Sequence, residues 1–137
     1  MATYTQAEVI VSLESEANYS AAANLYTVVG IHTNGKAVQR ANNETPALGI
    51  LMNRPNSGQP AAVAISGLVP ALFSASITEG TQVQAAAGGK VAAAAAAGSG
   101  ATHNRRFIVG TVVKNGGGDN QVGVIAVHPA PIHVVST

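Results

Sequence analysis

The stretch FIVGTVVKNGGGDNQVGVIAV, residues 107–127, decides the fold class of this chain. Two runs rich in Val and Ile flank a cluster of Asn, Gly and Asp, where a positive φ is cheap for Gly and tolerable for Asn. This pattern predicts two β-strands joined by a hairpin turn at residues 115–118, NGGG. Two more turn signals, NG at residues 34–35 and GG at residues 88–89, predict hairpins of the same kind.

Outward from this hairpin, short Val- and Ile-rich runs alternate with Gly, Pro and Asn clusters from Tyr26 onward. Their spacing is typical of an all-β chain, and we expect residues 25–137 to form one small β-barrel, β-tulip-like or sandwich domain. The six alanines at residues 92–97 favour a helix by propensity. Isolated helices shorter than ~12 residues are marginal, however, and glycines close this run on both sides. We therefore predict a strand that leads into a loop through His103.

Residues 1–24 differ from the rest in composition, and we interpret them as an N-terminal arm. They hold three of the six acidic residues, no Gly and no Pro, and one β-like run, EVIVSL. Arms of this kind are ordered by what they touch, and Tyr4, Val9, Val11 and Tyr19 would give this one apolar surface to bury. The alternative is a terminal strand packed on its own domain.

The chain also resembles itself. The matching segments are NGKAVQRA (34–41) with GGKVAAAA (88–95), ALGILMN (47–53) with IVGTVVKN (108–115), and GQPAAVAIS (58–66) with DNQVGVIAV (119–127). Such self-similarity indicates a duplicated unit, but all-β chains repeat strand and turn composition in any case. Both explanations stay open at this point.

Composition excludes several classes of function. Charged residues make up 9% of the 137 residues, and the net charge is +1, so weak repulsion between copies favours association. Most apolar residues are Ala and Val, whose small side chains give a thin core, and we expect self-association to supplement it. Arg105 and Arg106 form the only basic cluster, which is too little for a nucleic-acid binder. No apolar run reaches the ~18 residues of a membrane span, and no Lys or Arg precedes Lys36 as in a secretory signal, so we expect neither.

The inventory of reactive side chains predicts no enzyme, no cofactor and no metal site. The single aspartate, Asp119, lies in a glycine turn, where a turn role is the simplest interpretation, and the chain has no Cys. A Ser-His-Asp triad needs a carboxylate that orients the imidazole. His128 and His133 flank an extended HPAPIH segment, and a zinc site there would need a third ligand from elsewhere.

The stretch from Ala47 to Val127 is similar to the small phage head-decoration proteins, also called capsid cement proteins. The motifs that carry this resemblance are a V-x-I-x-G strand, an x-I-T-x-G-x-x-V turn and strand, a GGK hairpin followed by an Ala-rich loop, and a G-x-V-x-x-x-G-like strand. Here they fall at residues 63–67, 76–83, 88–90 and from Val109 onward. These are glycine and β-branched positions, which serve folding and carry no catalytic signature.

The resemblance implies a β-barrel-like homotrimer, made in the host cytoplasm, that sits on the outer surface of an icosahedral virion. There it would bridge neighbouring subunits of the major capsid protein. We expect the arm and nearby loops to make these contacts through Tyr4, Val9, Val11, Tyr19 and Arg54. The alternative is a non-catalytic β-rich binding module of a virion spike or tail that contacts a carbohydrate or a receptor.

Overall fold

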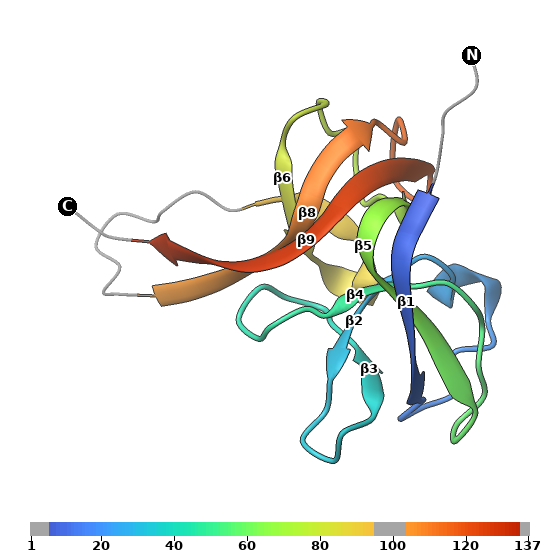
Figure 1. Cartoon of the computed structure of the whole chain (residues 1–137). Helices are drawn as coiled ribbons and strands as arrows, with labels where there is room; N and C mark the ends of the chain where they lie inside the picture. The colour runs from blue at the N-terminus through green and yellow to red at the C-terminus, as the bar shows by residue number, and fades with distance from the viewer. Residues whose placement is uncertain (1–5, 95–103, 135–137) are drawn as a thin grey trace.

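The computed structural model describes residues 6–94 and 104–134, and these form an all-β chain with one curled nine-stranded sheet (Figure 1). Two short 3-10 turns, η1 (Ala22–Asn24) and η2 (Ala87–Gly89), are the only helical elements in those two ranges. The strands are β1 (Gln6–Glu14), β2 (Val28–Ile31), β3 (Ala37–Gln39), β4 (Gly49–Leu51), β5 (Pro60–Leu72), β6 (Gln82–Ala85), β7 (Val91–Ala93), β8 (Asn104–Lys114) and β9 (Val122–Val134). The predicted fold class is confirmed.

All three predicted hairpins are present. The hairpin β2–β3 turns through Gly35, whose φ is 84°, and β6–β7 turns through Gly88 and Gly89, which also have positive φ. The hairpin β8–β9 turns through residues 115–121, which connect the two strand-forming runs of residues 107–127. The alanine run begins as the end of β7, as predicted, and its continuation through His103 lies outside the described residues.

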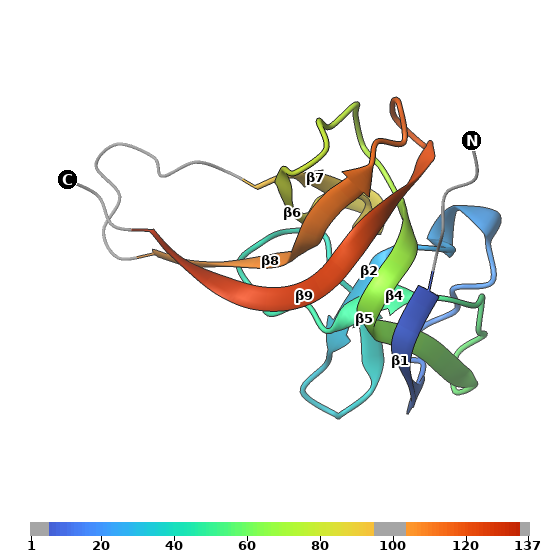
Figure 2. The same cartoon turned by 45° about the horizontal axis from the view of Figure 1, so that its top comes forward.

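The sheet reads the same from its two ends. Its strand order is β3-β2-β4-β5-β9-β8-β6-β7, so β3-β2-β4-β5 from one end corresponds to β7-β6-β8-β9 from the other. Figure 2 shows β1 in the lower part of the molecule, β6, β7 and β8 in the upper part, and β5 running upward from beside β1. This symmetry of strand order is the arrangement expected of a duplicated unit.

Pairing registers match between the two halves. Val29 pairs with both Gln39 and Gly49, and its counterpart Val83 pairs with both Ala93 and Gly110. The strand β1 also has a counterpart, which is the second half of β5. The strand β1 pairs with the first half of β5, and the second half of β5 pairs with β9 in the same register. Each unit therefore contains five strands, and β5 belongs to both units.

Backbone hydrogen bonds outside the strands repeat as well. The N–H of Tyr26 donates to the carbonyl of Leu51 at 2.9 Å, and the N–H of Gly80 donates to the carbonyl of Val112 at 2.8 Å. Further matched pairs are Leu51 to Thr27 with Val112 to Thr81, His32 to Lys36 with Ala86 to Lys90, Ser15 to Gln59 with Phe73 to Gln121, and Gly58 to Ser15 with Asn120 to Phe73. The duplication left open above is therefore confirmed. The hydrogen bonds align Gly58 with Asn120, whereas the sequence comparison aligns Gly58 with Asp119, one residue earlier.

Each five-stranded unit curls into a small ring. A single parallel bridge between Ser15 and Ala37 joins the end of β1 to the start of β3, and the bridge between Phe73 and Val91 joins β5 to β7 in the same way. We call these the first ring (β1 to the first half of β5) and the second ring (the second half of β5 to β9). The barrel-like character of the chain comes from these two closures.

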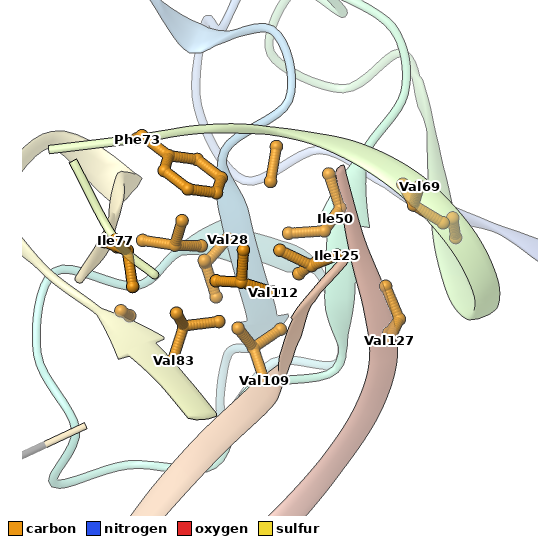
Figure 3. Close-up of a cluster of buried hydrophobic side chains, with 14 residues drawn as sticks. Val28, Ile50, Val69, Phe73, Ile77, Val83, Val109, Val112, Ile125 and Val127 are labelled. Atoms are coloured by element: carbon orange, nitrogen blue, oxygen red, sulfur yellow. The ribbon is translucent and has the colours of Figure 1, made fainter. Parts of the chain in front are cut away.

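The apolar core consists of two clusters, and the larger one contains residues of both rings. The first ring encloses a buried cluster of Tyr19, Val29, Ala37, Leu51, Ala61 and Val63. The larger cluster fills the second ring, contains the fully buried Phe73 and also includes Val28, Ile50 and Ala64 from the first ring (Figure 3). The two rings are therefore packed against each other through side chains that β2, β4 and β5 turn away from the first cluster.

Residues 6–24 lie along the first ring. The strand β1 pairs with β5 from Gln6 to Glu14 and packs Val11 and Leu13 against the first cluster, while Tyr19 is itself part of that cluster. This is the terminal-strand alternative stated above, and the physical reason is that β1 supplies the apolar side chains that close one side of this ring. The division of the chain at residue 24 stays a prediction.

Candidate binding surface

Several charged side chains in the described part of the chain are paired with nearby groups, whereas the buried Nε of Arg106 has no hydrogen-bond partner. Lys90 and Asp119 form an ion pair at 2.8 Å, and Lys36 lies 3.6 Å from a carboxylate oxygen of Glu14. Asp119 lies in the turn before β9, where the sequence placed it. Among the residues whose side chains the structure describes, which leave out Glu8 and His133, no group of three His, Cys, Asp or Glu is arranged to hold a metal ion.

Glu79 serves the β8–β9 turn. Its carboxylate accepts a hydrogen bond from the backbone N–H of Asn115 at 2.9 Å, and this bond is the main reason that the pKa of the Glu79 carboxyl is lowered. The side chain of Asn115 in turn accepts from the N–H of Ile77 and donates to Ser76. These bonds tie the turn to the loop after β5, which is a structural role.

An open groove of about 420 Å³ lies where the two rings meet. Its lining consists of Ala22, Ala23, Leu25, Tyr26, Leu72, Asn120 and Val122. The first four come from the link between β1 and β2, Leu72 ends β5, Asn120 lies in the turn before β9, and Val122 begins β9. The backbone N–H of Leu72 donates to the carbonyl of Tyr26 at 2.9 Å and holds the two walls together. We call this surface the junction groove.

The junction groove holds both non-glycine residues with positive φ in the described ranges. Tyr26 has φ 66° and Asn120 has φ 62°. Asn tolerates this left-handed conformation, whereas for a bulky residue such as Tyr it is an outlier that costs on the order of 1–3 kcal/mol. Tyr26 is held there because its N–H and its carbonyl are both bonded to other strands.

In the other ring, the positions that correspond to Tyr26 and Asn120 are occupied by glycine. The counterpart of Tyr26 is Gly80, with φ 88°, and the counterpart of Asn120 is Gly58, with φ 81°. Glycine adopts this conformation without steric penalty. In each pair, one ring keeps the relaxed glycine and the other ring carries a side chain, and both side chains line the same groove.

Two other depressions are less distinctive. One, of about 320 Å³, is lined by Ile31, Arg40, Pro46, Ala47 and Leu48. Its Arg40 guanidinium donates to the carbonyls of Ile31 and Pro46 and so is used in joining two loops. The other, of about 440 Å³, lies between β1, β5 and β9 beside Gln6. Neither has a strained residue in its lining.

No protein-family model matches the chain, and no curated protein matches it. Among the described residues, no helix is both long enough and apolar enough to cross a membrane.

The five residues predicted to contact a capsid do not gather at one place. Val9 is 45% exposed and Arg54 is exposed, whereas Val11 is half-buried on the first ring. Tyr19 is 9% exposed, and its hydroxyl accepts a hydrogen bond from the N–H of Gln39 at 2.9 Å, so its own chain accounts for its burial. Tyr4 lies outside the described residues. Contact of these residues with a shell stays a prediction.

Sequence reasoning missed the junction groove. Leu25 and Tyr26 lie just after the predicted arm of residues 1–24, and Asn120 and Val122 carry only the sequence signals of a turn and a strand. A signal was nevertheless present, because aligning the two units places Tyr26 opposite Gly80 and Asn120 opposite Gly58.

Proposed function

We propose that this chain is a structural decoration protein of a phage head. It binds the outer surface of the assembled icosahedral capsid as a homotrimer and stabilises the shell by bridging neighbouring subunits of the major capsid protein. The observation that carries the proposal is the placement of the resembling motifs. Residues 63–67 lie in β5, residues 88–90 lie in the β6–β7 hairpin, and Val109 lies in β8. The resemblance thus follows the strand that both rings share and continues through the second ring.

The arrangement of side chains supports a binding role. The described carboxylates and histidines hold turns, pair with lysines or lie at the surface, and the most distinctive feature is a groove without ionised side chains. A protein that binds the assembled shell and not its separated subunits stabilises the shell by mass action and needs no turnover chemistry. Three linked copies would strengthen each weak contact through avidity.

Sedimentation with purified, undecorated heads tests the proposal. The heads should come from the phage whose genome encodes this chain, and unassembled major capsid protein serves as the control. We expect saturable binding of trimers to heads and none to the unassembled subunits. Absence of the chain from the head pellet at saturating concentrations would exclude a decoration role.

A further inference from the structure

Three departures from the duplicated unit meet at the junction groove. The first two are the side chains of Tyr26 and Asn120 at positions where the other ring has glycine. The third is an insertion, because the link from Ser15 to Tyr26 is four residues longer than the matching link from Phe73 to Gly80. This longer link contains η1, whose Ala22 and Ala23 form one wall.

Convergence of these departures on one surface points to a binding site. A duplicated scaffold folds with the residues that both copies share, and features added to one copy are where repeat proteins place their binding faces. Residues held in sparsely populated backbone conformations also cluster at functional sites. Tyr26 and Asn120 are far apart in the sequence, so a local folding requirement of one loop does not explain both.

The lining of the groove defines the chemistry of its occupant. Leu25, Leu72 and Val122 supply apolar surface, and Val122 is 50% exposed although it begins a central strand. The lining contains no acidic or basic side chain, and the neighbouring Lys90 and Asp119 are paired with each other at 2.8 Å. Asn120 adds an amide whose nitrogen lies 3.4 Å from the Asp119 carboxylate and whose oxygen can accept a hydrogen bond. Such a surface suits apolar side chains on an uncharged, extended protein segment, whose backbone the amide can bind.

A second copy of this chain could add to the end of the first by repeating the contact between the two rings, but the side chains at the open ends disfavour this. Inside the chain, Leu25 of the first ring and Leu72 of the second ring share the groove. Their counterparts at the two open ends are Glu79 and Glu14. Repeating the junction between copies would therefore bring two carboxylates together where the chain has two leucines, and Lys36, 3.6 Å from the Glu14 carboxylate, offsets only part of this charge. Like charges oppose such an addition.

We propose that the junction groove seats an uncharged, apolar segment of the major capsid protein. This inference rests on the proposed decoration role and identifies the surface that performs it. The groove volume, about 420 Å³, lies within the range of about 300–1,000 Å³ found for ligand pockets. It therefore fits a few side chains of a segment and not the face of a folded domain.

Binding of variants to purified heads tests this assignment. Val122→Asp places a charge in the groove, and Val113→Asp is the matched control, because Val113 is 41% exposed on β8 and does not line the groove. We expect Val122→Asp to weaken binding to heads at least tenfold and Val113→Asp to change it less than twofold. Asn120→Gly, which installs the residue of the other ring, should weaken binding while leaving the unfolding transition close to that of the wild type.

The possible outcomes separate this inference from the proposed function. If the wild type binds heads and Val122→Asp and Asn120→Gly bind equally well, the groove assignment is wrong and the decoration role stands. If the wild type does not bind heads, both fail. If Val122→Asp instead loses its trimeric mass in solution, the groove is a contact between copies, which also overturns the assignment to the capsid protein.

Discussion

Two glycines, Gly49 and Gly110, give the sharpest test of the duplication. Each lies in a strand that crosses its neighbour closely at a carbonyl group. A Cβ at Gly49 would overlap the carbonyl oxygen of Ala64 and lie 2.9 Å from its carbon. A Cβ at Gly110 would overlap the carbonyl oxygen of Ala126 and lie 3.0 Å from its carbon. Ordinary carbon–carbon contacts are about 3.5–4.0 Å, so either strand must move.

The expected magnitude follows from these distances. Overpacking in a well-packed core typically costs about 1–3 kcal/mol, and here the obstacle is backbone that cannot rotate away, so we expect Gly49→Ala and Gly110→Ala each to lower the free energy of unfolding by about 3 kcal/mol. Gly118→Ala is the control, because its φ is not in the left-handed range and the nearest atom is 4.0 Å away. It should be neutral or stabilising by up to about 1 kcal/mol.

Urea denaturation followed by circular dichroism measures these differences. The reasoning requires Gly49→Ala and Gly110→Ala to behave alike, because the duplication gives them the same neighbours. A loss below about 1 kcal/mol at either site, or destabilisation by Gly118→Ala of the same size, would refute the packing argument. A large loss at only one of the two would show that the rings are not equivalent at this crossing.

Other variants test the core, a buried hydroxyl and the pH dependence. Phe73→Ala should lower the free energy of unfolding by about 3–5 kcal/mol, because this ring is fully buried; a loss below half of that, measured in urea, would contradict its central position. Tyr19→Phe should cost about 0.5–1.5 kcal/mol through the unpaired N–H of Gln39, and an unchanged denaturation midpoint would show that water replaces the hydroxyl. The pKa of Glu79 is lowered on folding, chiefly by the hydrogen bond from Asn115, so its contribution is present above the unfolded pKa and is lost as the pH falls through the folded pKa. Glu79→Gln should therefore remove part of the acid sensitivity seen in thermal melts between neutral and acidic pH, and identical pH profiles would contradict this.

Local chemistry was enough to predict the three hairpin turns and the strands on each side of them. The NGGG turn and the Val- and Ile-rich runs on each side of it indicate the β8–β9 hairpin through residues that are adjacent in the sequence. The same holds for the hairpins at Gly35 and Gly88. The self-similarity of the sequence also aligned Gly49 with Gly110, which the structure confirms. These features depend on residues close together in the chain or on a direct comparison of two segments.

Long-range pairing was harder to predict. The run in β1 has the composition of a strand, but nothing in it specifies that its partner is β5, whose first residue is Pro60. Val9 and Ile10 are both exposed because the register shifts between them, and such a bulge is not visible in the alternation of residues. The segment therefore resembled an arm that needs an external partner.

The junction groove depends on tertiary structure in the same way. The left-handed conformation of Tyr26 is imposed by hydrogen bonds to Leu51 and Leu72, and intrinsic preference argues against it for Tyr. Its proximity to Asn120 follows from the pairing of β5 with β9. A sequence can mark such a residue only through its counterpart in the other unit.

Thermal melting of purified heads, titrated with this protein, tests the decoration role most directly. A ligand that binds only the assembled state stabilises it by about 2.7 kcal/mol per site at a hundredfold excess over its Kd. We expect the melting temperature of the heads to rise with the concentration of the chain and to level off at a fixed number of chains per shell. Heads that melt at the same temperature with and without a saturating amount of the chain would contradict the account.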